Sequence, residues 1–352
     1  MFVAPVYHVL PLATIERERA LPVSGNVTAK LNQKVNPTDI IAEAIWAREH
    51  VLIDVTRTLG ISPNAADRLI KVKQGDKLSQ DAEVAVSKGI ISRTVRSPRA
   101  GRVVIVGGGQ VLMETGEASL ELKAGLPGTI VQIIPNRGAV IRTVGALIQG
   151  TWGNGRIDTG GLHNMTENPD DVLDASRLDV SLRGSIILAG LLKDADTLRV
   201  AAELPVRGLI LSSISPALLP VAQQMRFPIV AIDGFGNLPM NSAAYKLLTS
   251  NAKREVTINA EAFNRYTGTR PEVIIPLPVS QEPPPPNDVE KLEPGQTVRM
   301  RRDPHAGSIG TLTKITPGLV TLPSGLRSRV VEVKLENDEK VLVPLVNLEI
   351  VG

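Results

Sequence analysis

Short apolar runs separated by glycine-containing turns fill residues 20 to 150. The runs recur about every 8–12 residues, a spacing typical of compact all-β barrels and sandwiches. One segment departs from this pattern: residues 54–70 carry leucine and alanine at helical spacing, and Ser62 and Pro63 form an N-cap followed by a first-turn proline. We therefore predict a β-rich domain over residues 1–165, interrupted by one helical insertion.

Two stretches inside this region share one pattern of residue types. Residues 97–105 and 126–134 each place a proline and a glycine before a β-branched run. Such self-similarity indicates an internal quasi-repeat of one strand-and-turn unit.

The pattern changes between residues 179 and 278. Continuous apolar runs at 185–190, 208–213 and 227–234 alternate with helical segments at 195–203, 216–225 and 240–250, before a final strand. Alternation of this kind predicts parallel strands joined by right-handed crossovers. We therefore predict a small α/β domain over residues 179–278.

Prolines then punctuate residues 279–291, which predicts a semi-rigid polyproline II linker. Residues 292–352 return to short alternating strands, enough for one small barrel. The predicted fold class is thus a multidomain β plus α/β protein.

The pattern of short strands and turns in the first domain resembles the barrel-sandwich hybrid fold of biotinyl and lipoyl carrier domains and of the related module in the membrane-complex subunit RnfC. The resemblance rests on residues 97–105 and 126–134 and on the Gly75-Asp76 turn. Carrier domains hold their modified lysine in Ala-Met-Lys-Met or a similar hairpin tip, which this chain lacks. Lys123 ends an alternating strand instead, so we predict the fold without its cofactor.

The last module resembles the KOW motif, an SH3-like barrel unit of the transcription factor NusG and several ribosomal proteins. The matching features are Gly295 before a strand, the turn over 304–307, and Gly310 before the next strand. The segment 341–349 is similar to the last strand and turn of such barrels. The resemblance implies an RNA or protein partner.

Glycines in the KOW-like loop let its backbone approach a ligand, while neighbouring arginines supply guanidinium groups for RNA phosphates. The predicted contact residues are Arg299, Arg301, Arg302, His305, Gly307 and Gly310. Alternatively, the glycines only close the barrel and the arginines protect an edge strand from aggregation. Residues 291–352 carry nine Lys and Arg against seven Asp and Glu and no aromatic residue. Weak charge and no stacking surface leave a protein partner as open as RNA.

Composition restricts the chemistry. The absence of cysteine excludes disulfides, thiolate metal sites and cysteine nucleophiles. The four histidines are far apart, without HxH or HExxH spacing, so neither a metal nor another cofactor is predicted. The net charge of +3 predicts no polyanion binding by itself.

Two further loops carry candidate ligand residues. The loop over 150–161 contains Gly153, Gly155 and Arg156, but neither a GxGxxG helix start nor a P-loop. It reads either as a hinge between domains or as a ligand loop.

Asp233, Gly234 and Asn237 follow a predicted buried strand, where open α/β sheets bind ligands, together with Ser212, Ser213 and Ser215. Asp233 equally suits a turn cap. No nucleophile and base pair accompanies these residues, so an enzyme is not favoured.

The first hypothesis is a non-enzymatic adaptor or assembly protein whose KOW-like module contacts RNA, a ribosome or RNA polymerase component, or another protein. The second is a small-molecule-binding or enzymatic α/β domain with its ligand near Asp233 and the loop over 150–155. No signal peptide or run of about 18 apolar residues is found, so we expect a cytoplasmic chain without a membrane span. Apolar runs with few aromatics are compatible with a homo-oligomer.

Overall fold

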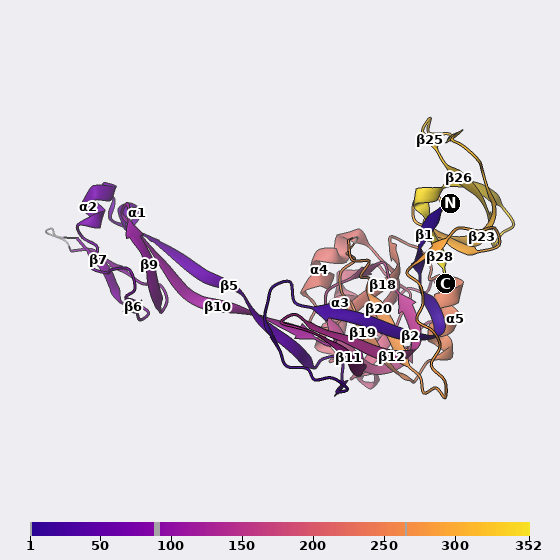
Figure 1. Cartoon of the computed structure of the whole chain (residues 1–352), viewed down its shortest axis with the longest axis horizontal. Helices are drawn as coiled ribbons and strands as arrows, with labels where there is room; N and C mark the ends of the chain where they lie inside the picture. Colours follow the sequence, from indigo (N-terminus) through magenta and orange to yellow (C-terminus); the bar gives the residue numbers. More distant parts are fainter. Residues whose placement is uncertain (1, 88–91, 265) are drawn as a thin grey trace.

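The protein is elongated, with a body at one end and a small module held away from it at the other (Figure 1). The computed structural model describes residues 2–87, 92–264 and 266–352. Strands account for 45% of the chain and helices for 13%, which confirms a β-rich protein of several sheets.

A two-stranded antiparallel arm connects the two ends (Figure 1). It consists of β5 (Ile40–Asp54) and β10 (Gln110–Lys123), paired along their whole length with three register shifts. Ala44 packs in the body and Ile53 in the core of the distal module. The nine residue-to-residue steps of extended strand from Ala44 to Ile53 span about 30 Å.

The distal module comprises residues 51–113 and has its own hydrophobic core, built around Val84, Val111 and Met113. Its secondary structure consists of α1 (Val55–Leu59), α2 (Pro63–Asp67), β6 (Lys77–Leu78), β7 (Glu83–Val86), β8 (Thr94–Arg96) and β9 (Gly101–Gly107).

The predicted helical insertion over 54–70 is confirmed as two short helices. The Asp54 side chain accepts a hydrogen bond from the Arg57 amide at the start of α1, and Gly60 ends that helix with φ +69°. Pro63 is the first residue of α2. The cap, the left-handed glycine and the proline fix where each helix starts and stops.

The expected single compact β domain over residues 20–150 is wrong in one respect, because this stretch divides between two cores. The first copy of the quasi-repeat forms β9 in the distal module, and the second forms β11 (Gly128–Ile134) in the body. Both copies are strands, as predicted. Similar turn spacing at both ends of the arm hides the division in the sequence.

The body is organised around a twelve-stranded sheet. Its parallel part contains β14 (Ile157–Asn164), β15 (Ser185–Leu188), β16 (Leu191–Leu192), β17 (Gly208–Ile214) and β18 (Ile229–Phe235). The predicted alternation is confirmed, since α3 (Ala195–Glu203), α4 (Leu219–Gln224) and α5 (Ser242–Ser250) lie between or after these strands. Separate apolar clusters cover the two sides of the sheet.

The same sheet continues without a break into antiparallel strands. The additional strands are β2 (Val9–Ala20), β4 (Lys34–Val35), β11, β12 (Gly138–Gln149), β13 (Trp152–Gly153), β19 (Glu255–Asn259) and β20 (Glu272–Pro276). Since β12 pairs with β20 and β14 with β19, the sheet crosses the boundary expected near residue 165. The interpretation of residues 150–161 as a hinge is also wrong. Within this stretch, β13 pairs with β18 and β14 pairs with β19, so both belong to the sheet.

A terminal module, defined here as residues 289–352 together with β1 (Val3–Tyr7), packs against the body. Its seven-stranded sheet adds β21 (Val289–Lys291), β22 (Thr297–Met300), β23 (Ile309–Ile315), β26 (Val330–Leu335), β27 (Lys340–Pro344) and β28 (Leu348–Val351) to β1. β1 lies between β21 and β28, antiparallel to the first and parallel to the second. Both ends of the chain therefore meet in this module (Figure 1).

The proline-rich segment differs from the expected linker over 279–291. Residues 289–291 form β21, the Pro283 carbonyl accepts a hydrogen bond from Thr14, and the Asp288 carbonyl accepts one from the Val6 amide. The segment is thus fastened to β2 and β1 along its course.

Short elements complete the description: β3 (Asn26–Val27), β24 (Val320–Thr321), β25 (Arg327–Ser328), and the 3-10 turns η1 (Ala175–Arg177), η2 (Val180–Leu182), η3 (Pro216–Leu218) and η4 (Leu345–Asn347). Within the described ranges, no helix has the length and apolar character needed to cross a membrane.

Candidate functional site

Two of the predicted sites meet where the terminal module packs against the body. Asp233 lies near the end of β18, and Arg299 lies on β22. The Arg299 Nη2 atom is 3.1 Å from Asp233 Oδ1 and 3.3 Å from the Asp233 carbonyl oxygen. The side chains of both residues are almost fully buried, so this ion pair is an internal contact between two parts of the fold.

Glu349 of β28 extends this pair into a buried charge cluster. Its carboxylate is 2.6 Å from Arg270 Nη2, 3.2 Å from Arg301 Nε and 3.7 Å from Arg299 Nη1. The Arg299 guanidinium also lies 4.5 Å from the centre of the Tyr7 ring, a cation–π distance. We call these six residues the junction cluster, which comprises Tyr7, Asp233, Arg270, Arg299, Arg301 and Glu349.

Burial sets the electrostatics of the junction cluster. Burial raises the pKa of the Asp233 carboxyl, while the positive charge of Arg299 and hydrogen bonds from Asn241 act in the opposite direction. Burial likewise raises the pKa of the Tyr7 hydroxyl. Ordinary acid–base chemistry near neutral pH is therefore not favoured at the Tyr7 hydroxyl.

A pocket of about 150 Å³ opens beside the cluster, lined by Thr151, Phe263, Arg302 and Gly307 among others. Within the described part of the chain, Arg299 Nε and the Tyr7 hydroxyl have no hydrogen-bond partner. Thr151 accepts from Arg299 Nη2 at 3.3 Å and donates to the Ile232 carbonyl at 2.8 Å. The loop starting at residue 150 and the KOW-like loop thus share one pocket.

The remaining residues predicted for the KOW-like contact divide by exposure. Arg299 is buried, whereas the Arg301 side chain is 40% exposed, Arg302 is exposed and His305 is half-buried. Gly307 has φ +81°. A Cβ atom on Gly310 would lie 2.6 Å from the Lys334 carbonyl oxygen, so this glycine permits close strand packing. Of the predicted contact residues, Arg301, Arg302 and the half-buried His305 reach solvent.

The Asp233 carboxylate is occupied by structural contacts. It accepts hydrogen bonds from the Asn241 amide at 2.8 Å and from Asn241 Nδ2, while Asn241 Oδ1 caps α5 by accepting from the Ala244 amide. Ser212 and Ser213 donate to the carbonyls of Pro169 and Gly236. The expected crevice shared by Asp233 and these serines is therefore filled by internal hydrogen bonds.

The other predicted ligand residues are spread over the surrounding sheet. Gly153 is buried in β13, where a Cβ atom would lie 2.4 Å from the Ala260 carbonyl oxygen. The Gly155 amide donates to that same carbonyl, and Arg156 is exposed. Gly234 is buried with φ +108°, and Asn237 is exposed. Gly153 thus permits close strand packing, whereas Gly155 is exposed and has φ +79°.

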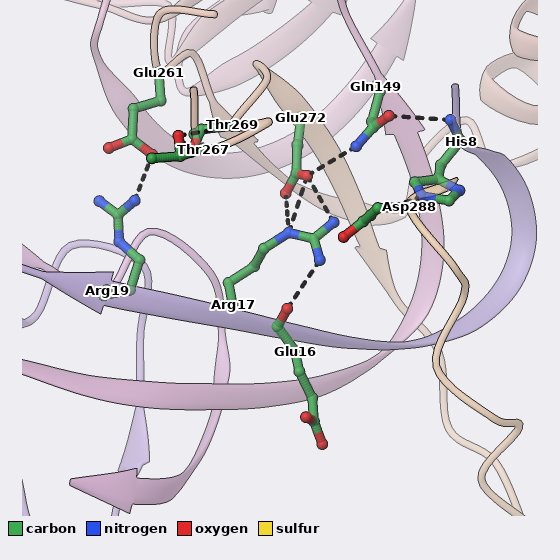
Figure 2. Close-up of polar contacts among 10 residues, drawn as sticks. All are labelled: His8, Glu16, Arg17, Arg19, Gln149, Glu261, Thr267, Thr269, Glu272 and Asp288. Atoms are coloured by element: carbon green, nitrogen blue, oxygen red, sulfur yellow. Dashed lines mark hydrogen bonds and ion pairs between the residues drawn. The ribbon is translucent and has the colours of Figure 1, made fainter. Parts of the chain in front are cut away.

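A larger polar cleft of about 510 Å³, which the sequence analysis missed, lies next to the junction cluster. The cleft is formed by β2, the end of β12, β19, β20 and the loop between β19 and β20. Arg270 lines both this cleft and the smaller pocket beside the junction cluster. Arg17 forms a two-pronged ion pair with Glu272, at 2.7 and 3.1 Å, and Arg19 pairs with Glu261 (Figure 2). Cations and carboxylates alternate around the cleft.

Hydrogen bonds link this cleft to the start of the chain. The Gln149 side chain donates to Glu272 and accepts from the His8 amide, and His8 Nε2 lies 3.2 Å from Asp288 (Figure 2). The hydrogen bond with His8 lowers the pKa of Asp288. Asn259 lines the cleft, is 6% exposed, and has a buried Oδ1 atom without a hydrogen-bond partner in the described chain.

One sequence signal could have located the cleft. Residues 16–19 read Glu-Arg-Glu-Arg inside a twelve-residue strand. Since side chains alternate between the faces of a strand, Arg17 and Arg19 share one face. Their partners Glu261 and Glu272 are more than 240 residues away, which pattern analysis cannot supply.

The described residues contain no group of three or more histidine, cysteine, aspartate or glutamate side chains that could hold a metal ion. Comparison of the chain with protein-family models gives no match. Comparison with curated proteins gives no match either.

Proposed function

We propose that the protein is a non-enzymatic adaptor or assembly factor that presents two binding surfaces at a fixed separation. The observation that carries this proposal is the separation of the distal module's hydrophobic core from the apolar clusters of the body by a paired arm. A two-stranded arm of about 30 Å between cores adds no stability to either of them. It does set the distance between whatever the two ends bind.

At the body end, the exposed loop of the terminal module is the proposed partner contact. Arg301, Arg302 and His305 lie on it, next to the pocket beside the junction cluster. Phe2 precedes β1 and Tyr7 ends it, and their rings are covered by Arg329 and Arg299. Phe263 lines the pocket and is 42% exposed. A single exposed ring in the pocket lining offers little stacking surface, which favours a protein or a folded RNA over single-stranded RNA.

The test is recovery of partners from the native host without nuclease treatment, read by mass spectrometry and by the 260/280 nm absorbance ratio. Arg302→Glu reverses an exposed charge on the loop, and Lys314→Glu is the matched control, an exposed cation elsewhere in the same module. We expect Arg302→Glu to reduce recovery of the partner several-fold and Lys314→Glu to leave it unchanged. Equal recovery with both variants would overturn the terminal-module contact.

A second candidate function is the binding of a small polar molecule in the polar cleft, close to the ligand site expected near Asp233. The observation that favours it is the unpartnered Oδ1 atom of Asn259, because buried polar atoms are nearly always paired. Native mass spectrometry of freshly purified protein should then show added mass that Asn259→Ala removes. Asn64→Ala, on an exposed asparagine of α2, is the control, and an unliganded wild-type mass would count against this function.

A further inference from the structure

The charge of the chain is concentrated in the distal module. Residues 51–113 contain ten Lys and Arg against five Asp and Glu, a net charge of +5. The rest of the chain carries 29 Lys and Arg against 31 Asp and Glu, a net charge of −2. The overall value of +3 therefore conceals a cationic module held away from a slightly anionic body.

Most of the described cations in this module are exposed and unpaired. Glu83 pairs with Lys71 and Arg96, and Arg99 pairs with Glu49. Six others make no ion pair within the described chain, although all are exposed: Arg57, Arg68, Lys73, Lys77, Arg93 and Arg102. They come from the helices, the β7–β8 hairpin and the sheet, so exposed positive charge is spread over several elements of the module.

Two of these cations are placed against each other. Lys77 on β6 is the direct cross-strand neighbour of Arg102 on β9. Like charges directly opposite one another destabilise an antiparallel pair. Glu114 on β10 is the other cross-strand neighbour of Arg102 and offsets part of that repulsion, and an anion bound across the two cations would offset the rest.

We infer that the distal module binds the phosphate backbone of double-stranded nucleic acid. Exposed cations on several sides of a small module suit a ligand with regularly spaced negative charge, read without regard to sequence. Residues 51–113 contain no Phe, Tyr or Trp, so single strands have nothing to stack on. This inference goes beyond the proposed partner contact, which lies on the terminal module at the other end of the arm.

The experiment uses the full chain and fluorescence anisotropy with labelled 20-base-pair RNA and DNA duplexes over a series of NaCl concentrations. Lys77→Gln with Arg102→Gln removes the paired cations. The matched control, Arg226→Gln with Lys246→Gln, removes two exposed cations from the body and gives the same net charge. Circular dichroism checks that both variants fold.

We expect the wild type to bind at 50 mM NaCl with affinity that falls steeply with salt. The distal variant should bind about tenfold more weakly, and its slope of log K against log salt should be shallower by about 1.8, the value for two lost phosphate contacts. The body variant should match the wild type. A difference between the RNA and DNA duplexes assigns the natural source of the phosphates.

Failure to bind either duplex, or an equal loss in both variants, would overturn the inference. The exposed cations would also attract an acidic polypeptide. Leu52, Leu112 and Ile105 form a cross-strand apolar row on the same module, with Leu52 and Ile105 more than half exposed, which would contact the apolar side chains of a protein partner. Binding of poly-glutamate in place of the duplexes would therefore assign the module to a protein partner. Neither result would affect the Arg302 experiment.

Discussion

Arg299 is shared by two carboxylates that belong to different parts of the fold. Asp233 comes from the body and Glu349 from the terminal module, and all three side chains are almost fully buried. Desolvating such charges is costly, and the cost is offset only while each partner is present. The junction therefore tolerates the loss of Arg299 poorly, and the exposed cations around it matter much less for stability.

Replacing Arg299 by methionine should lower the free energy of unfolding by about 3–5 kcal/mol at pH 7, since it leaves the buried Asp233 carboxylate without a cation and removes one of the three cations near Glu349. Arg302→Met, an exposed neighbour, should change stability by no more than about 0.5 kcal/mol. Urea denaturation of both variants measures the difference. Similar midpoints would show that the junction cluster carries little energy.

The same variant gives a pH dependence. Burial raises the folded-state pKa of Asp233 above its unfolded value, so stability is lost as the pH rises through the folded pKa. Without Arg299 the pKa of Asp233 rises further, because the attraction that lowers it is gone. The defect of Arg299→Met should therefore shrink as the pH falls from 7 toward 4, as denaturation curves at each pH would show.

Gly153 offers a second prediction at the scale of one residue. A Cβ atom there would lie 2.4 Å from the Ala260 carbonyl oxygen, which directly follows β19 and accepts a hydrogen bond from the Gly155 amide, so it cannot move without disturbing that contact. Gly153→Ala should destabilise the protein by about 1–3 kcal/mol. Gly161→Ala, on the neighbouring β14 with no atom within 4 Å of the added carbon, is the control. Equal melting temperatures would contradict the packing role.

At the scale of elements, β1 holds the terminal module together from outside its own stretch of sequence. Ala4 and Val6 point into the core that also contains Val298 and Ile350, whereas Val3 is 62% exposed. This alternation is what a strand with one buried face requires.

Val6→Asp should destabilise the terminal module by about 3–5 kcal/mol, because it puts an unpaired charge in that core. Val3→Asp makes the same chemical change on the solvent face of the same strand and should be nearly neutral. Hydrogen exchange of the β28 amides is the measurement. Protection that survives in Val6→Asp would mean that β1 is dispensable.

Elements were predictable where the pattern is local. The helices at 195–203 and 242–250 and the strands at 208–214 and 229–235 follow from periodicity in short windows. The position of β1 in the terminal module could not be predicted, because its partner β28 lies at the other end of the chain. The arm was missed because its two strands, β5 and β10, are separated in the sequence by most of the distal module.

The candidate site was predictable only in fragments. Asp233 and Arg299 were each singled out for their position after a strand or before a loop. No sequence pattern predicts an ion pair between residues 66 positions apart. Because both side chains are buried, they hold two parts of the fold together and do not contact a ligand or partner as expected. The terminal arginines that do reach solvent remain predicted partner contacts.

At the scale of the whole molecule, the arm makes the distal module separable. Glu49 and Gly116 are opposite each other in the β5–β10 ladder, so a two-residue Asn-Gly turn can join them in place of residues 50–115. The distal core lies wholly within the removed segment. The shortened chain should keep the hydrogen-exchange protection of the body sheet and lose the long dimension seen by X-ray scattering. Loss of protection in β12 or β17 would show that the ends are coupled.

The parallel pairing of β1 with β28 also determines when, during synthesis of the chain, the terminal module can form. Val6 leaves the ribosome long before Ile350, by an interval on the order of tens of seconds at ordinary rates of translation. Until then β1 has no neighbour on that edge, and the terminal module cannot close. A chain that lacks β28 would leave the apolar faces of β1 and β22 uncovered, so the terminal module closes only after β28 has been synthesised.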